Sequence, residues 1–259
     1  MDADGAVRLV FLSSGVWWAV FTVEQLPAVG PTTLDGPEGK HAATVRRLRV
    51  GEHLLLSDRA GGMARCEVVA AAKDSLELAV AETWREPQPA LRVRLAQALV
   101  KGDRGELAVE LATEAGVDAV VPWRASRCVA KWDDGPRGAK ALARWRSTAE
   151  QAAKQARRAW TPQVDEPVST KQLAGLVSGA DATLVLHESA TESLASADLP
   201  DSGELILVVG PEGGITGEEL ATLTDAGAHV GRLGPTVLRA STAAAVALGA
   251  LGVRTDRWS

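Results

Sequence analysis

The sequence predicts two folded parts, a small and mostly β N-terminal domain and a larger α/β C-terminal domain with a largely parallel sheet. Residues 19–86 carry short apolar or alternating runs separated by turn residues, which is typical of strands. Two prolines within the segment 84–89 then stiffen the chain and mark a domain boundary. From Leu91 onward, apolar strand-like runs alternate with segments of helical length, which is the order expected for a parallel sheet covered by helices on both faces.

The N-terminal domain, residues 19–86, is expected to be a small barrel, and residues 1–18 form an extension before it. Gly61-Gly62 separates two of its strands in the manner of a hairpin. Strands are predicted over 20–23, 53–57, 64–70 and 75–81, and one helix over 39–48.

The C-terminal domain is expected to span residues 90–259. Two of its helices have the residues of a capping box, Asp103 with Glu106 and Thr216 with Glu219. Strands are predicted over 92–100, 119–122, 183–187, 204–209 and 229–233, and helices over 103–116, 139–159, 216–226 and 241–252.

The composition is that of a globular protein. A length of 259 residues suits one large domain or two modest ones, and 46% hydrophobic with 24% charged residues are ordinary values. The net charge of −5 means that any basic surface must be local. No apolar run reaches the roughly 20 residues that span a bilayer, and the apolar segment 9–21 lacks the basic start of a signal peptide. We therefore expect a cytoplasmic protein without a membrane partner.

The two cysteines, Cys66 and Cys128, lie far apart and have no metal-ligand spacing. We expect two reduced structural thiols in a reducing compartment, and no metal site.

The segment 205–219 carries the first candidate binding site. An apolar strand ends at Val209 and runs directly into the loop Gly210-Pro-Glu-Gly-Gly214. Ligands of open α/β sheets bind at such strand ends, and glycine lets backbone amides approach them closely. The loop matches neither phosphate-binding pattern, and Glu212 would repel a phosphate. Its carboxylate suits the cationic groups of S-adenosyl-L-methionine; the alternative is an ordinary tight turn.

A second loop of the same kind precedes the last helix. Residues 232–252 again run from strand to Gly-Pro loop to helix, and this helix consists almost wholly of Ala, Gly, Val and Leu. A helix that is apolar all round must be buried, and two such loops can enclose one ligand. Arg239 lies where the loop meets the helix, and we expect it to act in catalysis. The alternative is that Arg239 forms a structural pair with Glu212 or another acid.

Between Arg124 and Arg158 the chain is basic, with ten Lys and Arg residues against three acidic ones. Helical spacing places Lys154, Arg157 and Arg158 on one face, which suits contacts with phosphates, although charged runs are more often solvated surface. Three tryptophans lie within or beside this segment, Trp132, Trp145 and Trp160, and we expect them to be packed rather than stacked on bases.

These segments together resemble the ribosomal RNA small-subunit methyltransferase E family, within the knotted SPOUT superfamily. The resemblance runs from about Ala19 to Trp258. The segments that carry it are 210–214, 233–239, 101–104 with 113–116, 150–151 with Arg157, and His41 with 45–49. Ser241 stands where the family usually has a glutamate, and Ala19 or a neighbour stands where it tends to have an arginine, so catalytic roles are not carried over at these positions.

The resemblance implies a PUA-like RNA-binding barrel followed by a SPOUT methyltransferase domain with a trefoil knot. It implies a homodimer joined through the C-terminal domain, which uses S-adenosyl-L-methionine to methylate N3 of one uridine in 16S rRNA of the small ribosomal subunit. The almost wholly apolar last helix supports such a dimer. The alternatives are a SPOUT enzyme that methylates a ribose 2′-OH of tRNA or rRNA, and a catalytically silent RNA-binding homologue.

The motifs and the resemblance together select the candidate residues. Catalysis is expected from Arg239 and Glu212. Contacts to the cofactor are expected from Leu186, Val209, Gly210, Pro211, Glu212, Gly213, Gly214, Leu233, Gly234, Val237, Leu238 and Ser241. Contacts to RNA are expected from His41, Arg46, Arg47, Arg49, Lys101, Arg104, Lys154, Arg157 and Arg158.

Overall fold

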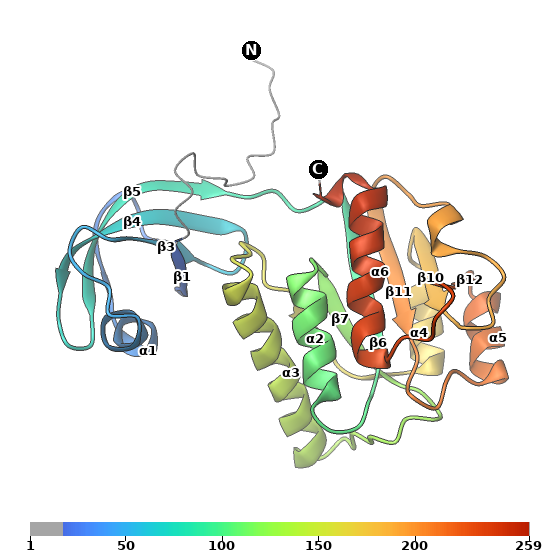
Figure 1. The fold of residues 1–259 in the computed structure, drawn as a ribbon. Coiled ribbons are helices and arrows are strands. Elements are labelled where there is room, and N and C mark those ends of the chain that lie inside the picture. Colours follow the sequence, from blue (N-terminus) through green and yellow to red (C-terminus); the bar gives the residue numbers. More distant parts are fainter. Residues whose placement is uncertain (1–17, 259) are drawn as a thin grey trace, which may run out of the picture. The chain divides into compact units, whose positions relative to one another are not determined.

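The computed structural model describes residues 18–258, in which the chain divides into two compact units (Figure 1). The first unit runs up to Asp58 and resumes over Gly62–Arg85, and the second comprises Arg59–Gly61 and Glu86–Ser259. Each unit has its own apolar core. Except for Trp18, the predicted N-terminal extension lies outside the described residues. No helix of the described chain is long and apolar enough to cross a membrane.

The first unit contains one five-stranded sheet. Its strand order is β1 (Ala19–Thr22), β3 (His53–Ser57), β4 (Gly62–Ala71), β5 (Leu76–Arg85) and β2 (Gly30–Leu34). The strand β1 runs parallel to β3, and the other neighbours are antiparallel. The four predicted strands are confirmed, but β2 was missed. Its sequence contains a proline, which a sheet tolerates at an edge, and Leu34 is its only fully buried residue.

The predicted helix over 39–48 starts and ends earlier in the structure. The helix α1 (Gly36–Lys40) has Pro37 in its first turn, where the missing N–H costs nothing, and a π-helical turn η1 (His41–Val45) follows it. A Cβ on the buried Gly39 would collide with the backbone carbonyl of Leu34. The close approach places Ala42 in the core of this unit.

The second unit is built on a parallel sheet, as predicted. Every strand pair in it is parallel. The order is β12 (His229–Gly231), β10 (Ala182–Leu186), β11 (Gly203–Val209), β6 (Leu91–Ala98), β7 (Ala119–Arg124) and β8 (Gln163–Val164), with β9 (Val168–Ser169) also paired to β7. The strands β8 and β9 were missed because two residues carry no periodicity.

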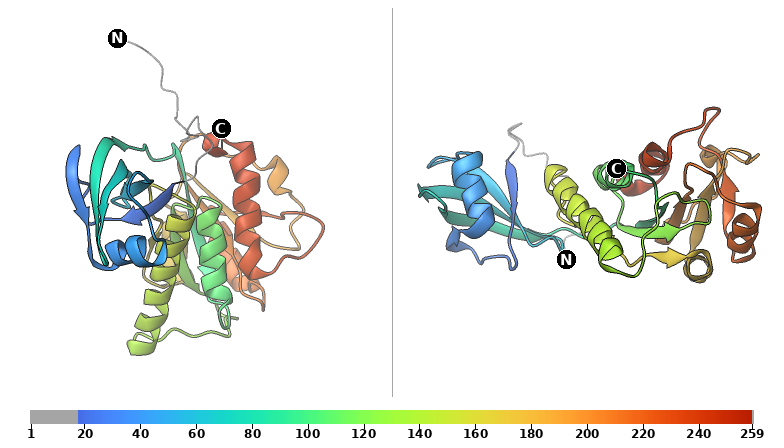
Figure 2. Two further views of the ribbon diagram at one scale, coloured as in Figure 1. Left: turned by 60° about the vertical axis from the view of Figure 1, so that its left-hand side comes forward. Right: turned by 90° about the horizontal axis from the view of Figure 1, so that it is seen from below.

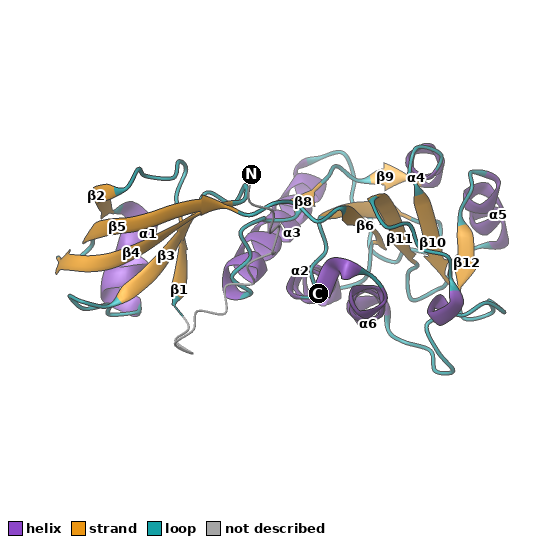
Figure 3. Cartoon of the chain, turned by 90° about the horizontal axis from the view of Figure 1, so that it is seen from above, coloured by secondary structure: helices purple, strands orange, loops and turns teal. Residues whose placement is uncertain are grey.

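Helices cover both faces of this sheet (Figures 2 and 3). One layer holds α2 (Arg104–Glu114), α3 (Pro136–Gln155) and α6 (Ala240–Arg254), and the other holds α4 (Thr170–Val177) and α5 (Gly217–Asp225). The apolar sequence of α6 follows from its position, because it packs against both α2 and β11. A Cβ on Gly105 would lie 2.9 Å from the ring of Trp145, so α2 and α3 approach closely there. Trp145 is 2% exposed and makes an edge contact with Trp132, which confirms that it is packed.

One of the two predicted capping boxes is wrong. The Asp103 side chain makes no capping hydrogen bond at the start of α2, and its backbone is not extended as a capping residue requires. The Glu106 carboxylate instead accepts a hydrogen bond of 2.8 Å from Nε of Arg144 on α3. At the start of α5, the box of Thr216 and Glu219 is confirmed.

The end of α3 also differs from the prediction. The helix ends at Gln155, and Arg157 adopts a left-handed φ of 56°. The N–H groups of Arg157 and Arg158 donate to the carbonyls of Lys154 and Ala153, which is the hydrogen-bond pattern of a Schellman motif. The three cations Lys154, Arg157 and Arg158 therefore do not share one helical face.

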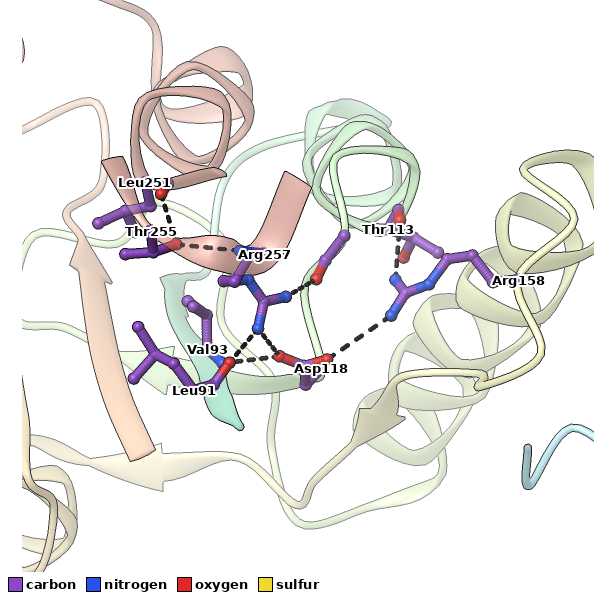
Figure 4. Close-up of polar contacts among 9 residues, drawn as sticks. Leu91, Val93, Thr113, Asp118, Arg158, Leu251, Thr255 and Arg257 are labelled. Carbon is purple, nitrogen blue, oxygen red and sulfur yellow. Dashed lines mark hydrogen bonds and ion pairs between the residues drawn. The ribbon is translucent and has the colours of Figure 1, made fainter. Parts of the chain in front are cut away.

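Arg158 turns toward the amino-terminal edge of the sheet (Figure 4). Its Nη1 donates to the Thr113 carbonyl at 2.8 Å, and its Nη2 lies 3.9 Å from Oδ1 of Asp118. Burial lowers the pKa of Arg158 to about 10, although the charge of Asp118 opposes this shift. The side chain of Arg158 thus has a structural place.

Arg257, near the C-terminus, completes the same cluster (Figure 4). Its Nη1 donates to Oδ2 of Asp118 at 2.8 Å, and the guanidinium also donates to the carbonyls of Leu91 and Gly116. Oδ2 of Asp118 accepts a further hydrogen bond from the Val93 N–H at 2.7 Å. These contacts bind the last turn of the described chain to the starts of β6 and β7.

Both cysteines are buried. Burial raises the pKa of Cys66 and of Cys128 to about 11, so both thiols remain protonated at neutral pH. This agrees with the prediction that they are structural.

Candidate active site

The carboxyl ends of three neighbouring strands form one edge of the second unit. In the register of the sheet, Leu186 at the end of β10 lies beside Val209 at the end of β11 and beside Gly231 at the end of β12. Because the strands are parallel, the loops that follow them leave the sheet on the same side. The loops 187–202, 210–216 and 232–239 therefore start next to one another although they are far apart in sequence.

These strand ends line a pocket of about 660 Å³. A volume of this size lies within the range of small-molecule sites. The lining residues are Arg104, Arg127, Leu186, His187, Glu188, Val209, Gly210, Pro211, Glu212, Gly213, Gly214, Ile215, Arg232, Leu233, Gly234, Pro235, Thr236, Val237, Leu238, Arg239, Ala240 and Ala243.

All the expected cofactor contacts except Ser241 line this pocket. Ser241 is 3% exposed and lies in the first turn of α6, on the side that packs into the core. Both expected catalytic residues, Glu212 and Arg239, are in the lining, and so is Arg104, which was expected to contact RNA. His187 and Arg127 also line the pocket but were not predicted as site residues. Each lies shortly after the end of a strand, and Arg127 also belongs to the basic segment 124–158.

The glycines of the loop after β11 are required by its geometry. A Cβ on Gly210 would lie 2.6 Å from Cγ1 of Ile215, and a Cβ on Gly213 would lie 3.0 Å from Cβ of Arg127. Gly214 has a φ of +74°, a conformation that side chains with a Cβ rarely adopt. The loop is thus confined by Ile215 and by Arg127.

The two expected catalytic residues do not pair with each other in the described part of the chain. Oε1 of Glu212 lies 3.4 Å from the backbone nitrogen of Lys101, and the side chain is exposed. Among residues 18–258, the guanidinium of Arg239 has neither an ion pair nor a hydrogen bond. The structural alternative, a pair between Arg239 and Glu212, is therefore not observed, and the positive charge of Arg239 is available to a ligand.

Glu219 is buried behind the pocket and holds three segments together. Its Oε1 accepts hydrogen bonds from the Ser126 N–H at 2.8 Å and from the Thr170 hydroxyl at 3.0 Å. Its Oε2 accepts from the N–H and the hydroxyl of Thr216 at 3.1 and 2.9 Å. Burial alone would raise the pKa of Glu219, but these hydrogen bonds outweigh it and hold the pKa below the ordinary value of 4.5. The carboxylate is therefore ionised at neutral pH.

His187 lines the pocket, and hydrogen bonds to one of its ring nitrogens define its tautomer. The Ser189 N–H donates to Nδ1 of His187 at 3.2 Å, and the Ser189 hydroxyl lies 2.8 Å from the same nitrogen. A backbone N–H can only donate, so Nδ1 is an acceptor and the hydrogen of the neutral ring is on Nε2. His187 thus offers an N–H donor that sequence reasoning did not anticipate.

The other expected RNA contacts lie in several places. In the first unit, the rings of His41 and Phe21 are packed edge to face, with their centroids 5.8 Å apart. Arg46, Arg47 and Arg49 are exposed. In the second unit, Lys101 and Arg104 are exposed and line a further pocket of about 560 Å³ together with Glu212. Lys154 is half-buried and Arg157 is exposed.

Comparison with known proteins finds relatives over both units. Residues 86–252 match the RNA methyltransferase domain family, and residues 34–81 match the RNA methyltransferase PUA domain family. The chain is 53% identical over 244 residues to Ribosomal RNA small subunit methyltransferase E of Mycobacterium bovis, over 92% of this chain and 93% of the relative. It is 31% identical over 243 residues to the protein of that name from Bacillus subtilis, over 91% and 94% of the two chains.

A solved structure extends this similarity to three dimensions. The crystal structure of Ribosomal RNA small subunit methyltransferase E from Neisseria gonorrhoeae, bound to S-adenosyl methionine, superimposes with a TM-score of 0.80. Its sequence is 26% identical, and the alignment covers 92% of this chain and 98% of that chain.

Proposed function

Because the chain belongs to the ribosomal RNA small subunit methyltransferase E family, we propose that it methylates N3 of one uridine in 16S rRNA of the small ribosomal subunit, with S-adenosyl-L-methionine as methyl donor. The observation that carries this proposal is the meeting of three strand-end loops in one glycine-rich pocket, with an unpaired arginine in its lining. A ribose 2′-OH as the acceptor, or a protein that binds RNA without catalysis, is an outcome of the test below.

The pocket fits the cofactor chemically. S-adenosyl-L-methionine carries a sulfonium and an ammonium cation, and the carboxylates of Glu188 and Glu212 in the lining complement positive charge. Glycines at 210, 213 and 214 let the chain approach a flat adenosine group closely. The N–H donor of His187 can serve a ring nitrogen or a ribose oxygen.

The bound cofactor supplies an electrophilic methyl group, and the side chains of this chain must prepare the nucleophile. The N3–H of uracil loses its proton, and negative charge then spreads onto O2 and O4. Arg239 stabilises this charge, and Glu212 accepts the proton, because both side chains line the pocket and are exposed to it. Since N3 faces the pairing partner in a duplex, the target base enters the pocket unpaired or flipped out.

Basic residues of both units would hold the RNA. The match of residues 34–81 to an RNA methyltransferase PUA domain supports a role for His41, Arg46, Arg47 and Arg49. Lys101 and Arg104 would contact phosphates beside the pocket. Lys154 and Arg157 would contact phosphates further away, at the amino-terminal edge of the sheet where α3 ends. Arg158 leaves the set of expected RNA contacts, because its guanidinium is bound to Thr113 and Asp118.

The proposal also includes finer features of the fold, the localisation and the oligomeric state, which the family resemblance supports. Residues 19–86 would close into a PUA-like barrel, residues 90–259 would form a SPOUT domain with a trefoil knot, and the protein would act in the cytoplasm. We also propose a homodimer joined through the C-terminal domain. Val246 and Val253 of α6 are 48% and 78% exposed, which suits a partner subunit on that side of the helix.

The test combines binding and product analysis. Calorimetry should show saturable binding of S-adenosyl-L-methionine to the purified chain, and 30S subunits from a strain that lacks the gene should gain 3-methyluridine when treated with it. Mass spectrometry of the digested 16S rRNA detects the product. A 2′-O-methyl nucleoside instead would redirect the proposal, and cofactor binding without any methylated product would favour the silent homologue.

A further inference from the structure

The loop after β7 is not one of the three strand-end loops described above, but it contacts the glycine-rich loop Gly210–Gly214. The loop 125–128 follows β7, and Nη1 of Arg127 donates a hydrogen bond of 3.0 Å to the carbonyl of Gly213. The backbones are also close, since a Cβ on Gly213 would lie 3.3 Å from the Arg127 carbonyl oxygen. Arg127 thus holds one side of the loop whose other side is confined by Ile215.

The backbone next to Arg127 is held in turn by Glu219. The buried carboxylate accepts a 2.8 Å hydrogen bond from the N–H of Ser126, the residue directly before Arg127. The same carboxylate caps α5 through Thr216, which lies two residues after the glycine-rich loop. The Glu219 carboxylate therefore connects two segments, through Ser126 directly before Arg127 and through Thr216, which follows the 210–214 loop at the start of α5.

We propose that Arg127 is a positioning residue for the cofactor, which holds the Gly210–Gly214 loop in its binding conformation from a backbone anchored by Glu219. The proposal rests on the proposed function, because it takes S-adenosyl-L-methionine as the ligand of the pocket. Glycine loses more conformational freedom on ordering than any other residue, and three of the five residues of this loop are glycines. A side chain that orders it before the ligand arrives therefore lowers the entropic cost of binding.

A direct contact between Arg127 and the cofactor is the competing explanation, because Arg127 itself lines the pocket. An arginine would bind the carboxylate of the methionine part of the cofactor, as this is its anionic group. The ligand 5′-methylthioadenosine separates the two explanations, since it keeps the adenosine and the S-methyl group but lacks the amino-acid part with that carboxylate. Loop positioning affects both ligands equally, whereas a direct contact affects S-adenosyl-L-methionine alone.

The experiment compares Arg127→Ala, Arg127→Lys and Arg144→Ala with the wild type. Arg144 is a matched control, because it is an exposed arginine with a 2.8 Å bond to Glu106 and does not line the pocket. We expect Arg127→Ala to raise the Kd of both ligands by roughly tenfold, the effect of losing one charge-assisted hydrogen bond. The KM for S-adenosyl-L-methionine should rise in step while kcat and Tm stay at wild-type values, and Arg127→Lys should recover much of the affinity.

Two results would overturn the positioning role. An unchanged Kd in Arg127→Ala would show that the loop needs no support, and a loss confined to S-adenosyl-L-methionine would show a direct contact with its carboxylate. These failures are distinct from a failure of the proposed function, in which the wild-type protein itself would bind neither ligand. Equal weakening of both ligands with an unchanged kcat supports the positioning role.

Discussion

The two edges of the parallel sheet use arginine in opposite ways. At the amino-terminal edge, Arg257 is 8% exposed at its side chain and bound to Asp118, and Arg94 is bound to Asp165 and Glu204 at 2.6 and 2.9 Å. At the carboxyl edge, the guanidinium of Arg239 has no ion pair or hydrogen bond among residues 18–258 and lines the pocket.

The difference shows that the role of an arginine, structural or ligand-binding, depends on whether its guanidinium is already paired within the protein. A buried, paired arginine joins segments and is costly to remove, whereas an unpaired one in a pocket leaves its charge for a ligand. Substitutions at the amino edge should therefore change stability with little effect on chemistry, and those at the carboxyl edge should do the reverse.

The largest effect should come from the carboxyl edge. We expect Arg239→Ala to lower kcat by roughly 10²- to 10³-fold, because its charge is needed most in the transition state. The Kd of S-adenosyl-L-methionine and the Tm should change little. Single-turnover methylation of 30S subunits measures the rate, and a wild-type rate at saturating substrates would end the catalytic role of Arg239.

Arg257→Ala tests the amino edge. Removing the guanidinium leaves Asp118 and the carbonyls of Leu91 and Gly116 without their main donor. We expect a loss of about 3 kcal/mol in the free energy of unfolding, because the Asp118 carboxylate would stay largely buried without its compensating positive charge. Urea unfolding measures it. The control is Arg254→Ala, because among residues 18–258 the Arg254 side chain donates to carbonyl groups and not to a carboxylate. A variant of wild-type stability but reduced kcat would contradict the division between the edges.

Gly213→Val should weaken cofactor binding without unfolding the protein. The new side chain would press on Arg127, and overpacking of about 1–3 kcal/mol corresponds to roughly 5- to 150-fold in Kd. Gly217→Ala is the matched control, because a Cβ there meets nothing within 4 Å. Calorimetry that gives both variants the same affinity would remove the loop from the site.

The smallest effect concerns pH and Glu219. Its pKa in the folded chain lies below the ordinary value of 4.5, so its ionised form stabilises the fold. This contribution is fully present above about pH 5 and is lost as pH falls through the folded-state pKa. Urea unfolding of the wild type and Glu219→Gln between pH 3 and 7 should show a stability difference that is constant at the upper end and shrinks below 4.5. A difference that grows with acidity would have the wrong sign.

Local patterns predicted much of this protein. The strand β3 over His53–Ser57 follows from its apolar run, and the start of α5 follows from Thr216 and Glu219. The strand β11 could be predicted because its buried residues, Leu205–Val209, form the continuous apolar run expected of a buried parallel strand. The position of the pocket follows as well, since parallel strands place their carboxyl ends at one edge and the glycines show which loop is crowded.

Contacts between distant segments were not predictable in the same way. Glu106 pairs with Arg144 and does not cap a helix. Arg158 was predicted on a helical face, but α3 ends before it at Gln155. Arg127 and His187 carry no motif, and each reaches the pocket only because its strand ends at the edge where the glycine-rich loop begins.

The sequence by itself therefore determined most of the longer elements, their alternation and the two glycine loops, because backbone conformation and hydrophobic periodicity depend on near neighbours. Only the tertiary structure decided which charges are paired. The energy of a charge depends on the burial and the partner that packing gives it, and Asp118 brings together Arg158 and Arg257 from opposite ends of the second half of the chain. For the same reason, only the fold could exclude the alternative that Arg239 pairs with Glu212, because it leaves the Arg239 guanidinium without an ion pair or hydrogen bond among residues 18–258.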